Sequence, residues 1–230
     1  MAEDKFVQLE NEERIAVSHA ESESNEWIFV CHGFAGNRKR QSEYLKLSKQ
    51  DFNVVTLDFR GNGNSSGDFI EQTLSSRIKD LKAVVEFFNP ENFVLFGTSF
   101  GGKVVFHAAS DLDPDKLVVK SPVTYNETME KFKSVVEEKG EFEFVEGKPI
   151  DTRFIKDLEE YSFDNLAINS PVAIFHGADD TTVHPEFSFK AAKNLDTDVM
   201  LQKLKDEKHS FSDEKKDYMF KLMTAWLESN

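Results

Sequence analysis

The chain has one cysteine, no long hydrophobic run and little proline. A single cysteine, Cys31, excludes a disulfide within the chain, so this is not a small disulfide-stabilised secreted domain. No apolar stretch approaches the roughly 18 residues of a membrane-spanning helix. The N-terminal segment MAEDKFVQLENEER is charged and lacks the apolar core of a signal peptide. We therefore expect a cytoplasmic protein without stable membrane insertion.

Positive charge is also scarce, because 28 lysines and arginines face 42 aspartates and glutamates, giving a net charge of −14. Such a chain is repelled by nucleic acid and by anionic membranes, so neither is an expected partner. Cysteine, histidine and carboxylate residues nowhere show the spacing of a metal site. The glycine-rich stretch 58–68 matches neither common nucleotide-binding signature. We therefore expect no metal and no cofactor.

The 230 residues suit one domain with a full hydrophobic core. Residues 5–10 and 14–20 predict a hairpin of strands. Beyond them, continuous apolar runs, typical of strands buried on both faces, alternate with segments of helical periodicity. This alternation predicts an α/β fold with a mostly parallel sheet and helices on both faces. The expected strands span 27–33, 52–61, 93–97, 116–122, 171–177 and 198–204, and the expected helices 38–49, 72–88, 100–110, 185–194 and 212–229, the last with Ser212 as N-cap.

Residues 122–168 interrupt this alternation. Two helical segments flank a small hairpin that turns at Gly147. The insertion is either a lid or a peripheral excursion, and its place beyond the carboxyl end of a parallel strand favours a lid over a site. Its aromatic side chains indicate a partly apolar acyl or aryl pocket; they are Phe132, Phe142, Phe144 and Phe154.

The segment GTSFG, from Gly97 to Gly101, lies between a predicted strand and a predicted helix. It matches G-x-S-x-G, in which the chain turns sharply and lifts the serine above the edge of the sheet. Side chains at 97 and 101 would collide with neighbouring backbone, so glycine is required there. Ser99 would then lie at the start of the following helix, whose dipole favours developing negative charge.

On these residues the chain resembles the α/β-hydrolases over nearly its whole length, in particular the branch of serine esterases, monoglyceride lipases and serine aminopeptidases. The resemblance implies a triad in the chain order Ser, acid, His. His209, between the last strand and the last helix, stands where the family has its catalytic histidine, whereas His184 lies within the acid loop. The family pattern H-G-x-x-D-x-x-V-P places the acid at Asp180, with Asp179 as the alternative.

The same resemblance implies an oxyanion hole made of two backbone N–H groups. One comes from Phe100, which follows the nucleophile. The other comes from Phe34, in the His-Gly-Phe segment 32–34, where His32 helps to hold the loop. Residues 58–68 resemble the family's D-x-R-G-x-G-x-S loop, and we expect Arg60 and Asp58 to pair there.

Serine, histidine and aspartate together indicate acyl transfer to water. The first hypothesis is a carboxylesterase acting on short-chain acyl or aryl esters, an expectation that rests on the resemblance to the family. A peptidase or thioesterase using the same triad is the second, and a non-catalytic binding protein on a hydrolase scaffold is the third. The expected partner is a small-molecule ester, and the protein is expected to be a monomer or a homodimer.

Overall fold

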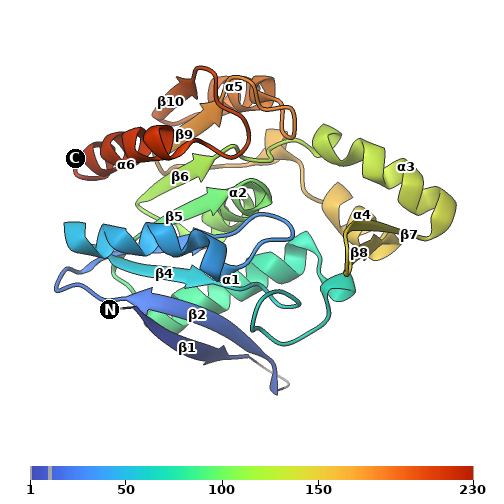
Figure 1. The fold of residues 1–230 in the computed structure, drawn as a ribbon, viewed down its shortest axis with the longest axis horizontal. Coiled ribbons are helices and arrows are strands. Elements are labelled where there is room, and N and C mark those ends of the chain that lie inside the picture. Colours follow the sequence, from blue (N-terminus) through green and yellow to red (C-terminus); the bar gives the residue numbers. More distant parts are fainter. Residues whose placement is uncertain (1, 10–11, 230) are drawn as a thin grey trace.

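The computed structural model describes residues 2–9 and 12–229, which form a central sheet with helices on both faces (Figure 1). The sheet has eight strands in the order β1-β2-β4-β3-β5-β6-β9-β10. Its strands are β1 (Glu3–Gln8), β2 (Arg14–Ala20), β3 (Glu26–Cys31), β4 (Asn53–Leu57), β5 (Asn92–Thr98), β6 (Lys116–Lys120), β9 (Val172–Gly177) and β10 (Val199–Leu204). The α-helices around it are α1 (Leu74–Phe88), α2 (Phe100–Leu112), α5 (Pro185–Asn194) and α6 (Asp213–Leu227).

Along the spatial order β4-β3-β5-β6-β9-β10, neighbouring strands pair in parallel. At the other edge, β1 and β2 add an antiparallel hairpin. Parallel strands are covered on both faces, so their sequences read as continuous apolar runs. In β3 the side chains alternate between two cores. Phe29 and Cys31 face the core under α1 and α2, whereas Ile28 and Val30 face the core under α6. The predicted α/β fold class is confirmed.

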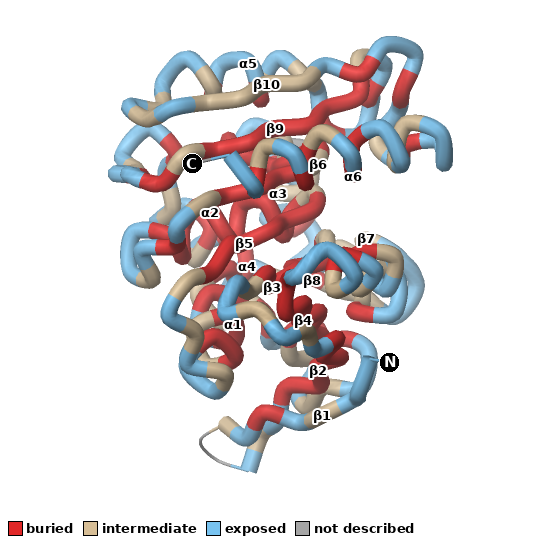
Figure 2. Tube along the Cα trace, turned by 90° about the vertical axis from the view of Figure 1, so that its left-hand side faces the viewer, coloured by how far each residue is buried: buried red, intermediate tan, exposed pale blue. Residues whose placement is uncertain are grey.

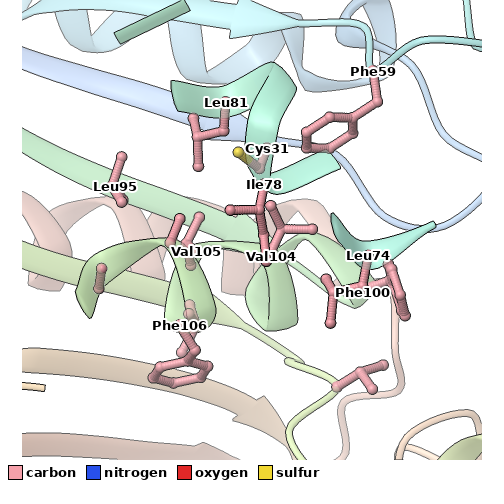
Figure 3. Packing of buried hydrophobic residues seen from close by; sticks show 14 of the residues in the cluster. Cys31, Phe59, Leu74, Ile78, Leu81, Leu95, Phe100, Val104, Val105 and Phe106 are labelled. Carbon is pink, nitrogen blue, oxygen red and sulfur yellow. The ribbon is translucent and has the colours of Figure 1, made fainter. Parts of the chain in front are cut away.

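Buried residues are concentrated along the central strands, and the exposed residues lie on the surrounding helices and loops (Figure 2). The core beneath α1 and α2 is built from their facing side chains (Figure 3). Ile78 and Leu81 of α1 pack toward Val104 and Val105 of α2. This packing holds the start of α2 in place, directly after Ser99.

The helix predicted at residues 38–49 is present as a 3₁₀-helix, η2 (Arg38–Gln50). Arg38, Tyr44 and Leu47 are its buried residues, all in phase with a three-residue repeat. A 3₁₀-helix has three residues per turn and aligns such side chains on one face, so the burial pattern accounts for the helix type.

The insertion between β6 and β9 contains the predicted helices and hairpin. It lies beyond the carboxyl ends of the parallel strands (Figure 1). Its elements are η4 (Asn126–Met129), α3 (Glu130–Lys139), β7 (Glu141–Val145), β8 (Lys148–Asp151), α4 (Thr152–Glu159) and η5 (Phe163–Asn165), while η3 (Phe69–Glu71) precedes α1 in the core. Among the described residues, no helix is both long and apolar enough to cross a lipid bilayer.

Candidate active site

Ser99 stands at a strained turn between β5 and α2. Its backbone has φ 53° and ψ −121°, a conformation that costs a non-glycine residue about 1–3 kcal/mol. A Cβ at Gly97 would lie 2.3 Å from the carbonyl oxygen of Gly101. A Cβ at Gly101 would lie 2.4 Å from the carbonyl oxygen of Cys31. The glycines therefore allow α2 to approach β3 and β5 closely and to raise Ser99 at the end of the sheet.

Gly101→Ala is expected to destabilise the whole domain, because β3 and α2 must separate to admit the methyl group. We expect a loss of about 3 kcal/mol, which lowers Tm by roughly 10 °C for a chain of this length. Thermal unfolding followed by circular dichroism measures the shift. Ser110→Ala, at an exposed position of the same helix, is the matched control. An unchanged Tm in Gly101→Ala would contradict the close approach described above.

Asp180 lies in the turn after β9, and its carboxylate is buried. Oδ1 accepts backbone N–H groups from Thr182 at 2.9 Å and from Val183 at 3.0 Å. Oδ2 lies 2.7 Å from Nδ1 of His209. Burial alone favours the neutral carboxyl, but hydrogen bonds from His176 and His209 outweigh it and hold the pKa of Asp180 well below its usual range. Asp179, the alternative acid, is exposed, so the structure brings Asp180 to the histidine.

His176 is a second hydrogen-bond partner of this carboxylate. From the sequence, His176 served only to align the acid loop. Its Nε2 lies 3.2 Å from Asp180 Oδ2 and 3.0 Å from the carbonyl oxygen of Val183. Both neighbours are acceptors, so Nε2 carries the proton. Nδ1 then accepts from the hydroxyl of Ser188 at 2.6 Å. The buried imidazole thus helps to orient the acid, and it shares the oxygen Oδ2 with His209.

His209 is held in the loop between β10 and α6. Nδ1 is bonded to Asp180, so Nε2 is the ring nitrogen that can take a proton. The main chain of His209 is held from β6, because its carbonyl oxygen accepts from Lys120 Nζ at 2.9 Å and from Ser121 Oγ at 3.4 Å. Sequence reasoning missed Lys120. The available signal was a lysine ending an apolar strand next to the site.

Ser99 and His209 line the same cavity, of about 450 Å³. The chain thus folds so that β5, β9 and β10 deliver three groups to one end of the sheet. A hydroxyl, an imidazole and a buried carboxylate in this order can carry out nucleophilic acyl transfer.

The predicted oxyanion donors are Phe34 and Phe100. Phe100 opens α2, and the first N–H groups of a helix have no intrahelical acceptor. Phe34 follows β3, and its ring lies 5.3 Å from that of Phe100. The loop lies against the nucleophile, since a Cβ at Gly33 would be 3.1 Å from Cβ of Ser99. Arg77 of α1 fixes the loop by donating from Nη2 to the carbonyl oxygen of Phe34 at 2.6 Å.

His32 holds the other side of this loop. Nδ1 donates to the carbonyl oxygen of Gly33 at 2.6 Å, and Nε2 accepts from the backbone N–H of Phe59 at 3.2 Å. Burial lowers the pKa of His32 to about 3, so the ring stays neutral and keeps both bonds at physiological pH. The predicted loop-holding role of His32 fits these contacts.

A model of the prolyl oligopeptidase family matches residues 39–230. The chain belongs to the prolyl oligopeptidase family. The predicted resemblance to the α/β-hydrolase superfamily is thereby confirmed.

Among curated relatives, human mitochondrial palmitoyl-protein thioesterase ABHD10 is 28% identical over 174 residues, which cover 67% of this chain and 56% of the relative. Zebrafish lysophosphatidylserine lipase ABHD12 is 30% identical over 169 residues, which cover 68% of this chain and 44% of the relative. The chain thus spans about half the length of the curated relatives it matches.

Among solved structures, mouse α/β hydrolase domain-containing protein 10 superposes with a TM-score of 0.83 at 21% identity, covering 99% of this chain and 97% of the other. Est1E from Butyrivibrio proteoclasticus with bound ferulic acid superposes with a TM-score of 0.82 at 17% identity, covering 97% of each chain. At these identities the two superpositions show the shared fold.

The expected pairing of Arg60 with Asp58 is wrong. The loop turns at Gly61 and encloses the Asp58 carboxylate, which accepts from the backbone N–H of Asn64 at 2.9 Å and pairs with the Arg38 guanidinium. The side chain of Arg60 instead points toward α1, where its Nε lies 2.7 Å from Asp80 Oδ1.

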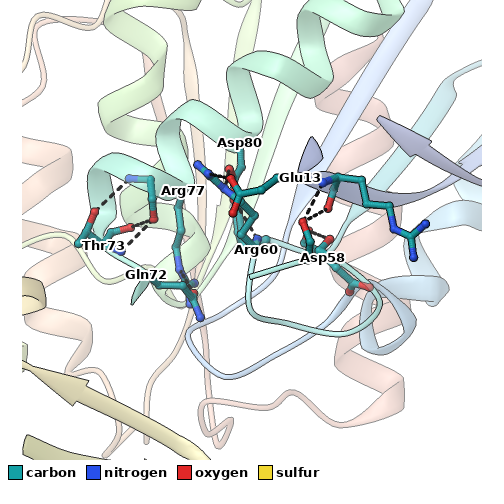
Figure 4. A network of polar contacts seen from close by, with 12 residues as sticks. Glu13, Asp58, Arg60, Gln72, Thr73, Arg77 and Asp80 are labelled. Carbon is teal, nitrogen blue, oxygen red and sulfur yellow. Dashed lines mark hydrogen bonds and ion pairs between the residues drawn. The ribbon is translucent and has the colours of Figure 1, made fainter. Parts of the chain in front are cut away.

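Figure 4 shows the Arg60 side chain with Asp80 and with Glu13, the second carboxylate at Arg60. Arg38 and Asp80 come from segments distant in sequence, so neither partner was visible in the local motif.

Proposed function

We propose that this chain is a serine hydrolase that cleaves carboxylic esters with short acyl or aryl groups. The observation that carries the proposal is the contact of His209 Nδ1 with the buried Asp180, in a cavity that His209 shares with Ser99. In this proposal Ser99 is the nucleophile and His209 is the general base. Asp180 orients the imidazole of His209 and stabilises its protonated form.

The reaction proceeds in two halves. His209 Nε2 takes the hydroxyl proton as Ser99 Oγ attacks the ester carbonyl. The N–H groups of Phe34 and Phe100 donate to the oxyanion of the tetrahedral intermediate. His209 then protonates the departing alcohol oxygen and an acyl-enzyme remains. Water, activated by His209, attacks the acyl carbon, releases the acid and restores Ser99.

The insertion contributes an apolar wall to the cavity, in keeping with a lid. Phe144 and Val145, at the end of β7, line the cavity, and the Phe144 ring lies 5.0 Å from Phe34. The hairpin is tied to the core by Lys148, whose Nζ donates to the carbonyl oxygen of Gly61 at 3.0 Å. Of the four aromatic residues predicted to form the pocket, Phe144 lines this cavity, and the others pack behind it: Phe132, Phe142 and Phe154.

A panel of p-nitrophenyl esters from acetate to palmitate, together with a ferulate ester, tests this proposal. Because the rings of Phe34 and Phe144 wall the cavity, we expect kcat/KM to be highest for short acyl and aryl esters. A profile that rises toward palmitate would contradict the short-chain assignment. Failure on every ester would contradict the carboxylesterase assignment.

Thioester cleavage is the second candidate, and the similarity to a palmitoyl-protein thioesterase favours it. The same triad and oxyanion donors serve both bonds, because both reactions pass through a tetrahedral oxyanion. Matched butyryl ester and butyryl thioester substrates distinguish the two activities. Aminoacyl p-nitroanilides in the same assay test the peptidase alternative.

A further inference from the structure

The charged side chains that line the cavity around Ser99 are mostly positive, whereas the protein as a whole is negative. The chain carries a net charge of −14. Among the described residues lining the cavity, however, three are cations and one is a carboxylate: Arg40, Lys120, Lys216 and Glu43. A cationic cavity in an acidic protein concentrates anions locally.

The cations come from three elements that line the cavity together with His209. Lys120 ends β6, and its Nζ bonds the carbonyl oxygen of His209 at 2.9 Å. Lys216 lies in the first turns of α6, which begins four residues after His209. Arg40 comes from η2, which also carries Tyr44 in the cavity wall. Phe34, Phe144 and Val145 form an apolar wall of the same cavity.

The carboxylates near these cations neutralise them only in part. Glu43 lies 3.6 Å from Lys216, which also contacts Asp213 at 3.4 Å. Within the described part of the chain, the Arg40 guanidinium has no ion-pair partner. Burial lowers the pKa of Lys120 to about 8, so its ammonium is still mostly charged at neutral pH. The Asp180 carboxylate is buried behind His209 and occupied by its own hydrogen bonds.

The mechanism determines which part of a substrate meets these cations. His209 must protonate the departing oxygen or sulfur, so the leaving group lies within hydrogen-bond reach of the imidazole. Lys120 bonds the main chain of His209, and the Lys216 charge acts on Lys120, whereas Phe34 belongs to the oxyanion loop and its ring contacts that of Phe144. The acyl group thus fits the apolar wall and the leaving group fits the cationic wall.

We propose that the substrate is an ester or thioester whose leaving group carries a carboxylate or phosphate, bound by Arg40 and Lys216 with Lys120 beneath them. This inference rests on the proposed hydrolase activity. It assigns the substrate class of that site.

Substrates with matched acyl groups and different leaving groups test the inference. 4-Butyryloxybenzoate, 4-butyryloxyphenyl phosphate and the neutral 4-butyryloxybenzamide share one acyl group and one ring and differ in the charge of the leaving group. We expect the wild-type kcat/KM for at least one anionic ester to exceed that for the amide by about tenfold, the size of one charged hydrogen bond. Comparison of the carboxylate with the phosphate identifies which oxyanion the site prefers. Added salt should reduce the preference.

Arg40→Gln and Lys216→Gln should each reduce the ratio of anionic to neutral kcat/KM by about five- to tenfold, through a higher KM for the anionic ester. Lys39→Gln, one residue from Arg40 and exposed outside the cavity, removes the same charge and should leave the ratio at the wild-type value. A wild-type ratio near one, or equal losses in Arg40→Gln and Lys39→Gln, would overturn the inference while leaving the hydrolase assignment intact.

A binding measurement separates this inference from failure of the hydrolase proposal. If none of these esters is cleaved, calorimetric titration of phenyl phosphate, benzoate and benzamide into the wild-type protein still reports on the cavity. We expect an anion to bind more tightly than benzamide, and Arg40→Gln to remove the difference. Equal binding of all three compounds, or a preference that persists in Arg40→Gln, would overturn the inference.

Discussion

Ser99→Ala is expected to lower kcat/KM for the best ester by at least about 10⁴-fold, since it removes the hydroxyl that forms the acyl-enzyme, and the neighbouring Thr98 hydroxyl donates to the carbonyl oxygen of Cys31. The residual rate should come from binding and the oxyanion donors alone. Hydrolysis of the best p-nitrophenyl ester measures the loss. Ser110→Ala, an exposed serine of the same helix, should retain the wild-type rate.

Covalent labelling provides an independent readout of the nucleophile. A fluorophosphonate should attach to wild-type Ser99 with loss of fluoride, and peptide mass spectrometry should locate the adduct. Ser99→Ala should remain unlabelled. Labelling at another serine, or undiminished hydrolysis by Ser99→Ala, would exclude Ser99 as the nucleophile.

Ser99→Gly separates chemistry from backbone strain. Glycine adopts positive φ at low cost, so this variant should be as inactive as Ser99→Ala but more stable than the wild type by about 1 kcal/mol. Thermal unfolding of the three proteins measures the difference. A Tm for Ser99→Gly at or below that of the wild type would show that the serine conformation carries no net strain.

Asp180→Asn is expected to lower kcat by about 10³- to 10⁴-fold while leaving the fold intact. The carboxylate accepts from two backbone N–H groups and from two imidazoles. An amide has one acceptor oxygen, so its NH₂ must face donors and displace His209 or favour the wrong tautomer. Hydrolysis by Asp180→Asn, with the exposed neighbour Asp179→Asn as the charge-matched control, measures the effect.

The effect of Asp180→Asn on the free energy of unfolding is expected to depend on pH. The folded-state pKa of Asp180 lies below its ordinary value of 3.8. Its ionised form therefore stabilises the folded protein above about pH 4, and that contribution is lost as the pH falls toward the folded-state value. The difference in unfolding free energy between wild type and Asp180→Asn should shrink from pH 7 to pH 3. A difference constant over this range, or wild-type activity in Asp180→Asn, would contradict the assignment of the acid.

The sequence by itself determined the sheet, the order of its elements and the position of the elbow. The apolar runs that became β3, β5 and β9 are buried on both faces, so their hydrophobicity carried a local signal for parallel strands. Gly97 and Gly101 carried an equally local signal, because each is required by contacts that any strand–turn–helix elbow makes.

The tertiary structure alone decided which side chains meet. It brings Asp180 rather than Asp179 to His209, and it pairs Arg60 with Asp80 rather than with Asp58. It places Lys120 at the end of β6 against the main chain of His209, because the loop after β10 reaches back across β9 to β6, although the two residues are 89 positions apart in sequence. Periodicity reports whether a residue is buried, but the partner of a polar group depends on side-chain direction within a turn and on strand order, which arise only once the chain has packed.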